Sequence, residues 1–334
     1  MKYFLIIGFI FSLFRLSAQS LDFLDTDFSR ADSIALSNSN LKLTNPEKLS
    51  EILTKDLDSE LEKFRVIFRW ITNNISYDTR MYALLKRKEN KLKYDRKKLL
   101  EWRKRFKEKI YKRTLKRKIS ICEGYSRVLE TMCRHVGISC ETISGYPRNE
   151  NSRIGLGKPD HAWNAVKINN KWYLADATWA SGYVNSSGHY FTRSFNKIYF
   201  LTDPSYFIAD HYPLDKSWIL LLNKPSLNEF LCSPIKLEGF YKKKLVHFFP
   251  KVGTIKINRD STFSFSFTSN AYKISTISTK LISKSKEYSD NFYQLSQDKE
   301  GYYFFKHKFI EKGTFKFYIY IDSKATFVYD ILVK

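Results

Sequence analysis

Apolar residues in the first half of the chain recur every three or four positions, which predicts amphipathic helices. Phe64, Ile67, Phe68 and Ile71 share one face of such a helix, which also contains Trp70. We expect this helix to lie in the core of its domain.

A second helical pattern begins at Ile121 and stops at Gly137, a residue type that commonly terminates helices. Its apolar positions include Tyr125 and Leu129. Cys122 therefore lies in the first turn of this helix.

Helical spacing also continues between Lys86 and Lys118, although nearly all residues between the apolar positions are basic. The apolar positions are Leu92, Leu99, Trp102, Phe106 and Ile110. We predict one long amphipathic helix over residues 86–118, inserted into the surrounding domain.

Short alternating runs follow the helices, which is typical of an antiparallel sheet and of α+β order. The predicted strands are Ile138 to Tyr146, Ala162 to Ile168 and Lys171 to Thr178. Asn169-Asn170 joins the last two runs and tolerates the positive φ of a two-residue turn. This register places Trp163 opposite Asp176, so His161 and Asp176 point to the same side of the sheet and should form a hydrogen bond.

The last hundred residues change to period-two alternation with turn residues between the runs. The predicted strands are Thr254 to Asn258, Thr262 to Thr268, Tyr302 to Phe309, Thr314 to Ile321 and Phe327 to Val333. We predict that residues 234–334 form a second domain, an all-β immunoglobulin-like sandwich.

The N-terminus combines Lys2, an apolar run and small residues near position 18, which is the pattern of a secretory signal peptide. We therefore predict a signal peptide at residues 1–18 and an exported protein that is periplasmic, displayed at the cell surface or secreted. An uncleaved N-terminal anchor is the alternative. Residues 19–60 form an N-terminal helical segment ahead of the domain at 61–225.

The formal net charge of +23 is concentrated in one segment. Residues 86–118 contain 18 Lys and Arg against 4 Asp and Glu, an excess of 14 positive charges. This segment is interpreted as a solvated cationic face over the cleft, and alternatively as a site for an anionic envelope polymer or membrane surface. Nucleic acid is the less favoured partner for an exported chain.

The chain has four cysteines and no Cys-x-x-Cys pair, which argues against a zinc site or a dense disulfide framework. We expect no metal and no cofactor. Cys122 is the candidate nucleophile, because free N–H groups at a helix N-terminus stabilise a thiolate. His161, 39 residues later, is the candidate base, and Asp176 is the acid that would orient it.

The residues around these positions resemble the transglutaminase-like superfamily, in particular its kyphoscoliosis-peptidase branch. The similarity covers about residues 60 to 225 and is carried by Phe64–Ile71, Ile75–Asp78, Cys122–Tyr125, His161–Asn164, Trp172–Trp179, Tyr199–Leu201 and His211–Pro213. The resemblance implies a papain-like fold with helices packed on an antiparallel sheet. It also implies acyl transfer through a thioester, with Cys122, His161 and Asp176 as nucleophile, base and orienting acid. The basic insertion before Cys122 departs from the shorter connection of the family.

Other residues of this region have two possible interpretations. Tyr77 is a candidate oxyanion donor together with the backbone N–H of Cys122. Trp163 and Trp179 are candidates for the wall of the substrate cleft, with core packing as the alternative. Gly124 is interpreted as leaving space for a substrate backbone, and His211 as a structural residue.

The sequence thus predicts a cysteine-dependent acyltransferase or peptidase that acts on protein or peptide amides. The alternative is a non-catalytic binding or scaffold protein that uses the same fold and the basic helix. The sequence does not distinguish hydrolysis from transamidation.

Overall fold

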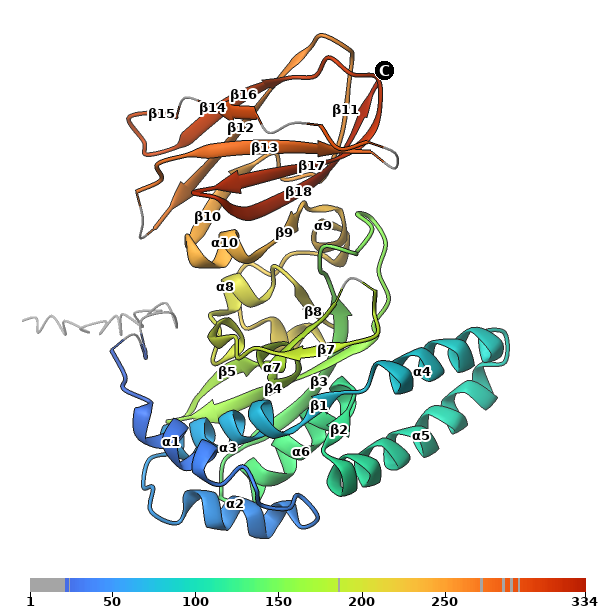
Figure 1. Ribbon diagram of the computed structural model, residues 1–334, viewed down its shortest axis with the longest axis vertical. Helices are drawn as coiled ribbons and strands as arrows, with labels where there is room; N and C mark the ends of the chain where they lie inside the picture. Colours follow the sequence, from blue (N-terminus) through green and yellow to red (C-terminus); the bar gives the residue numbers. More distant parts are fainter. Residues whose placement is uncertain are drawn as a thin grey trace, which may run out of the picture.

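The computed structural model describes residues 22–334 except 24, 186, 271–272, 284–285, 289–290 and 294. The predicted signal peptide at residues 1–18 lies outside the described residues. Helices and a mixed set of small sheets form the lower half of the molecule in Figure 1, and the strands from Leu245 onward form the upper half. The predicted α+β class is confirmed.

The helices concentrate before residue 136. They are α1 (Ser29–Ser37), α2 (Pro46–Thr54), α3 (Glu60–Asn74), α4 (Thr79–Leu92), α5 (Arg96–Arg117), α6 (Cys122–His135), α7 (Ala177–Ser181), α8 (Pro204–Phe207), α9 (Leu227–Cys232) and α10 (Glu238–Lys242), with 3-10 turns η2 (Lys197–Tyr199) and η3 (Lys216–Ile219).

The strands of the lower half belong to one sheet and two short pairs. The sheet has the order β5-β4-β3-β8, and β1 pairs with β2 and β6 with β7. Their bounds are β1 (Ser76–Tyr77), β2 (Ile119–Ser120), β3 (Cys140–Pro147), β4 (His161–Ile168), β5 (Lys171–Ala175), β6 (Gly182–Val184), β7 (Phe191–Arg193) and β8 (His211–Pro213).

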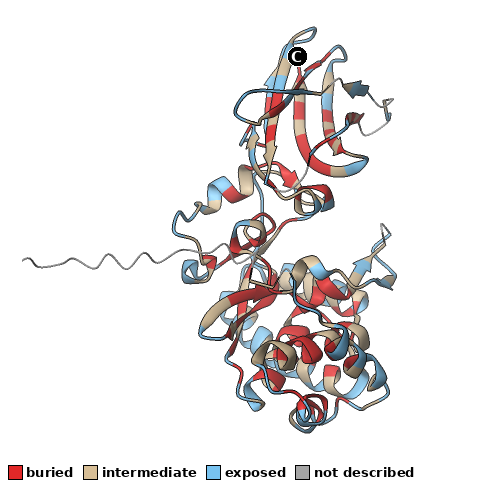
Figure 2. Ribbon diagram, turned by 90° about the vertical axis from the view of Figure 1, so that its left-hand side faces the viewer, coloured by how far each residue is buried: buried red, intermediate tan, exposed pale blue. Residues whose placement is uncertain are grey.

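Helix α3 is the centre of the lower core, and more than one of its faces is buried. Phe64, Ile67 and Trp70 are all fully buried. Figure 2 shows buried segments gathered among the helices of the lower half. The Arg65 guanidinium donates to both carboxylate oxygens of Asp32 in α1, at 2.6 and 2.8 Å. The N-terminal helices therefore pack on the same core as α3.

The predicted single helix over 86–118 is wrong, because the segment is a helical hairpin of α4 and α5 that projects from the core (Figure 1). The Asp95 carboxylate accepts a hydrogen bond from Lys98 N at 3.0 Å and so starts the second helix. The chain folds back because Met81, Phe106 and Ile110 pack together in one apolar cluster.

The predicted register of the β4–β5 hairpin is confirmed. Ile168 pairs with Lys171, and the pairing continues to Asn164 with Ala175. Asn169 and Asn170 have φ values of 49° and 64°, as a two-residue turn of this kind requires.

The predicted extension of this strand to Thr178 is wrong. β5 ends at Ala175, because the Asp176 carboxylate accepts hydrogen bonds from Thr178 N at 2.7 Å and Trp179 N at 3.1 Å. These bonds cap helix α7, which places Asp176 at the junction of strand and helix.

The upper half consists of two sheets with a shared aromatic core. One has the order β10-β12-β16-β15, and the other β11-β18-β17-β13-β14 with β9 also pairing with β18. Phe265 of the first sheet contacts Phe317 of the second with ring centroids 5.2 Å apart. The immunoglobulin-like topology stays a prediction.

The bounds of these strands extend the sequence prediction, which missed β9, β10 and β13 to β15. They are β9 (Ile235–Lys236), β10 (Leu245–Phe249), β11 (Thr254–Ile257), β12 (Thr262–Ser269), β13 (Ile277–Ile282), β14 (Asn291–Tyr293), β15 (Ser296–Gln297), β16 (Tyr303–Lys308), β17 (Gly313–Ile321) and β18 (Lys324–Val333). Among the described residues, none of the helices has the length and apolar character needed to cross a membrane.

Gly124 allows α6 to approach the hairpin closely. A Cβ atom at this position would lie 1.9 Å from Ser120 Oγ and 2.5 Å from Thr114 Oγ1. The interpretation of Gly124 as space for a substrate backbone is therefore wrong, because the missing side chain faces Thr114 and Ser120.

Gly124→Ala should destabilise the protein by about 1–3 kcal/mol, since the added methyl group overpacks this contact. The free energy of unfolding in urea measures the effect. Ser120→Ala removes the nearest atom, so adding it to Gly124→Ala should recover part of the loss. A Gly124→Ala protein as stable as wild type would contradict the close approach.

Candidate active site

Cys122 is the first residue of α6 and lines a cavity of 720 Å³, whose other lining residues include Tyr77 and Tyr241 of α10. Cys122 is only 7% exposed. The sulfur lies 4.0 Å from the carbonyl oxygen of Asp160, the residue before His161. Helix α6 thus brings the cysteine to the start of strand β4.

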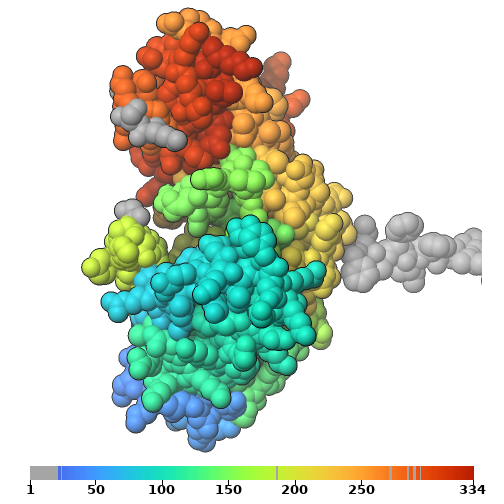
Figure 3. All heavy atoms as spheres, turned by 90° about the vertical axis from the view of Figure 1, so that its right-hand side faces the viewer, coloured from blue at the N-terminus to red at the C-terminus, as the bar shows by residue number. Residues whose placement is uncertain are grey.

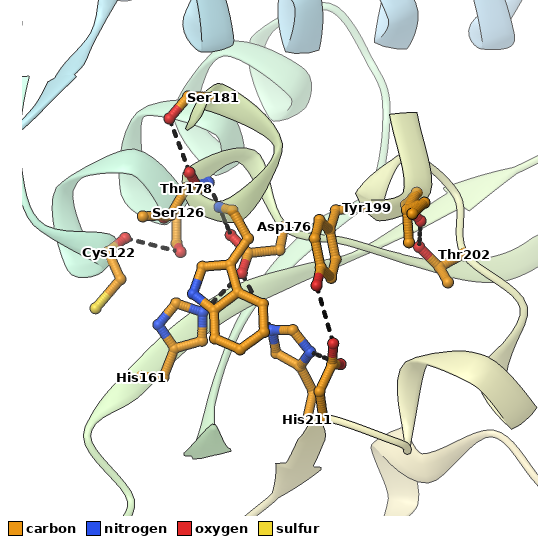
Figure 4. Close-up of polar contacts among 12 residues, drawn as sticks. Cys122, Ser126, His161, Asp176, Thr178, Ser181, Tyr199, Thr202 and His211 are labelled. Atoms are coloured by element: carbon orange, nitrogen blue, oxygen red, sulfur yellow. Dashed lines mark hydrogen bonds and ion pairs between the residues drawn. The ribbon is translucent and has the colours of Figure 1, made fainter. Parts of the chain in front are cut away.

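The predicted hydrogen bond between His161 and Asp176 is present, with His161 Nε2 2.6 Å from Asp176 Oδ2. Both residues are buried, and they come from β4 and from the cap of α7. The Cys122 sulfur faces the other edge of the imidazole ring, with which it interacts (Figure 4).

Two opposing effects set the pKa of His161. Burial lowers it, but the charge of Asp176 and the hydrogen bond to it outweigh burial and raise the pKa to about 10. Burial acts to raise the pKa of Asp176, yet the two neighbouring histidines hold it well below its usual value. At neutral pH the pair is therefore an imidazolium and a carboxylate.

His211 also contacts Asp176, although its position in the sequence had indicated a structural residue. Its Nε2 is 3.1 Å from Asp176 Oδ2, and its Nδ1 is 2.5 Å from Asp210 Oδ1. Burial lowers the pKa of His211, but these two carboxylates raise it overall. The only signal in the sequence was its place in the family-like segment His211–Pro213.

Asp210 connects these residues to α10, the helix that precedes the upper half of the molecule. Its Oδ2 accepts hydrogen bonds from Tyr199 at 3.0 Å and from Tyr241 of α10 at 2.6 Å. A chain of hydrogen bonds therefore runs from Tyr241 through Asp210 and His211 to Asp176. Figure 4 shows how His211 and Asp176, at the inner end of this chain, lie beside His161.

His161, Asp176 and His211 each offer one possible metal-ligand atom, and these three atoms lie within 4.8 Å of one another, a spacing that a metal ion could bridge. However, both histidine Nε2 atoms already reach the same oxygen, Asp176 Oδ2. We therefore interpret the cluster as a network of hydrogen bonds around one carboxylate.

Two of the three candidate cleft residues line the cavity, and the third lies in the core. Tyr77 and Trp179 line the cavity that contains Cys122 and His161, and the Trp179 ring lies 5.2 Å from the His161 ring. Trp163 is 1% exposed and packs against Phe207 beneath the site, so its core alternative is the one that the structure supports.

Residues 47–177 match the transglutaminase-like superfamily. The chain carries a transglutaminase-like domain. This match includes Cys122, His161 and Asp176 and ends before Trp179 and His211.

Relatives of the transglutaminase-like domain include kyphoscoliosis peptidase of Mus musculus, which is 35% identical over 65% of this chain and 31% of its own length. The Homo sapiens protein is 34% identical over 63% of this chain and 29% of its own length. Hillarin of Drosophila melanogaster is 25% identical over 66% of this chain and 26% of its own length. The chain thus spans less than a third of these relatives, and the similarity supports a cysteine-peptidase-like function at the level of the family.

The stability that protonated His161 gives to the transglutaminase-like domain should depend on pH. Because folding raises its pKa from 6.5 to about 10, this contribution is fully present below pH 6.5 and is lost as pH rises through about 10. The difference in unfolding free energy between wild type and His161→Gln should therefore shrink over this range. His189→Gln is the matched control, because it makes the same substitution at an exposed histidine that does not line up with Asp176. A constant difference for His161→Gln would contradict the raised pKa.

Proposed function

We propose that the domain catalyses cysteine-dependent acyl transfer on protein or peptide amides through a thioester. The observation that carries this proposal is the joint position of Cys122 and His161 at one cavity, with the fully buried Asp176 2.6 Å from His161. A protonated imidazole beside the sulfur stabilises the thiolate form, which is the nucleophile.

In the proposed reaction the Cys122 thiolate attacks the amide carbonyl, and the C–N bond breaks as His161 gives its proton to the leaving amine. Asp176 keeps the imidazole in place and stabilises its charge. Water or a primary amine then attacks the thioester, gives up a proton to His161 and releases the sulfur. The free N–H of Cys122 at the start of α6 and the Tyr77 hydroxyl are the proposed donors to the oxyanion.

Intact mass spectrometry of a glutamine-rich protein, incubated with the enzyme and with or without a primary amine, tests the proposal. Loss of ammonia with incorporation of the amine identifies a transamidase, and fragments of the substrate identify a peptidase. Either product should depend on Cys122, because the thioester forms on its sulfur.

The controls use the other cysteines of the chain. Cys133 and Cys140 are fully buried in the core, so Cys133→Ser should leave the reaction in place while Cys122→Ser abolishes it. If the folded wild-type protein leaves the mass of the substrate protein unchanged both with and without the amine, the alternative of a non-catalytic scaffold is favoured.

A second function, binding of an anionic membrane surface, is favoured by the tip of the helical hairpin. Tyr94, in the turn between α4 and α5, is 91% exposed, and Leu100, near the start of α5, is 55% exposed. Lys91, Lys93 and Lys97 lie near Tyr94 in the sequence. Figure 3 shows the hairpin, in teal, over one face of the molecule. Exposed amphipathic side chains amid basic residues suit the interface of an anionic bilayer.

Vesicles of phosphatidylglycerol and phosphatidylcholine should bind the protein in a sedimentation assay, and binding should weaken as salt rises. Lys93→Gln and Lys97→Gln should each weaken binding about five-fold, because each basic residue contributes about 1 kcal/mol near an anionic surface. Tyr94→Ser should also weaken it.

The matched control is Leu222→Ser, which removes an apolar side chain that is exposed in another part of the fold. Binding that is independent of salt would contradict the proposal. Salt-dependent binding that Tyr94→Ser leaves unchanged would favour a soluble polyanion as the partner.

A further inference from the structure

Two basic side chains, Arg148 and Lys236, line the same cavity as Cys122. Arg148 follows strand β3 and is 2% exposed, and Lys236 lies in strand β9. Neither residue takes part in the acyl transfer proposed above. Their surroundings nevertheless differ from those of an ordinary buried cation.

Among the described residues, the Arg148 guanidinium has only neutral hydrogen-bond partners. Its Nη1 donates to the Phe230 carbonyl at 2.6 Å and to Ser233 Oγ at 2.7 Å, and its Nη2 donates to the Ser233 carbonyl at 2.7 Å. Its buried Nε has no hydrogen-bond partner. A buried cation that is paired with neutral oxygens alone lacks the charge compensation that burial normally demands.

Lys236 brings a second basic group to the Ser233 hydroxyl that Arg148 contacts. Its Nζ lies 3.4 Å from Ser233 Oγ, the hydroxyl that also accepts from Arg148, while that hydroxyl donates to the Phe230 carbonyl at 3.0 Å. Burial, followed by repulsion from Arg148, lowers the pKa of Lys236 to about 7. The two cations therefore disfavour each other.

The nearby carboxylates are already occupied. Asp210 interacts with Lys236 at a distance, but its two oxygens accept from His211, Tyr199 and Tyr241. Glu238 pairs with Lys242 at 2.5 Å. Within the part of the chain that the structure describes, neither Arg148 nor Lys236 has a carboxylate within 4.0 Å, and Glu150 is exposed where it lines the cavity.

We propose that Arg148 and Lys236 form a subsite for a carboxylate of the substrate, so that the cleft selects acidic peptides. Lys236 makes the direct contact, because three of the Arg148 donors are engaged and the guanidinium acts mainly through its charge. The carboxylate belongs either to an Asp or Glu side chain or to a peptide C-terminus. This inference rests on the proposed function, since it assigns a substrate class to the same cleft.

Isothermal titration of the Cys122→Ala protein tests the subsite without turnover. The probes are N-acetyl-Ala-Gln-Ala-amide, its Glu counterpart, and the Gln peptide with a free C-terminal carboxylate. We expect at least one carboxylate peptide to bind about ten-fold more tightly than the neutral amide, as a charge-assisted hydrogen bond implies. The peptide that gains affinity identifies the source of the carboxylate.

The preference should disappear in Lys236→Gln and persist in Lys236→Arg, which keeps the charge. Lys256→Gln is the matched control, because this exposed lysine of β11 does not line the cavity. Equal affinity for all three peptides, or a preference that survives in Lys236→Gln, would overturn the subsite. Carboxylate preference without turnover in wild type would refute the acyl transfer alone, whereas turnover without the preference would refute the subsite alone.

Discussion

The candidate active site depends on one buried carboxylate. Both oxygens of Asp176 are used: Oδ1 accepts from the backbone N–H groups of Thr178 and Trp179, and Oδ2 faces His161 and His211. These contacts fix the end of β5, the start of α7 and the first residues of β4 and β8 relative to one another. Loss of the carboxylate would leave buried donors on three elements without an acceptor, so the site and the local fold share one interaction.

Burying so many ionisable groups is tolerable because their charges alternate. Asp176 lies between His211 and His161, and its carboxylate helps to raise the pKa of both histidines, while the two histidines lower the pKa of Asp176. The outer end of the hydrogen-bond chain, at Asp210, is held by Tyr241 of α10. The segment that leads into the β-rich upper half is therefore tied to the carboxylate that orients His161, beyond the end of the family match at residue 177.

Sequence reasoning succeeded where the determining interactions are local. The Asn169-Asn170 turn fixes the β4–β5 register, and the register fixes which face His161 and Asp176 share. Prediction from the sequence failed where the hydrogen-bond partner of a residue is distant in the chain. His211 reaches Asp176 across 35 residues because β8 pairs with β3, and no local pattern specifies that pairing. The role of Gly124 likewise depends on close approach to side chains of other elements, which spacing alone does not reveal.

The helical hairpin and the site are not independent parts of the structure. Lys86 of α4 pairs with Asp160, directly before His161, and Lys107 of α5 lies 3.0 Å from Glu123, directly after Cys122. Two ion pairs thus attach the hairpin to the chain neighbours of the proposed nucleophile and base. In both pairs the carboxylate side chain is partly buried, so salt screens the interaction less than it would at an open surface. The hairpin therefore helps to fix the position of Cys122 relative to His161, and residues of α4 such as Tyr82 also line the cavity at which the two meet.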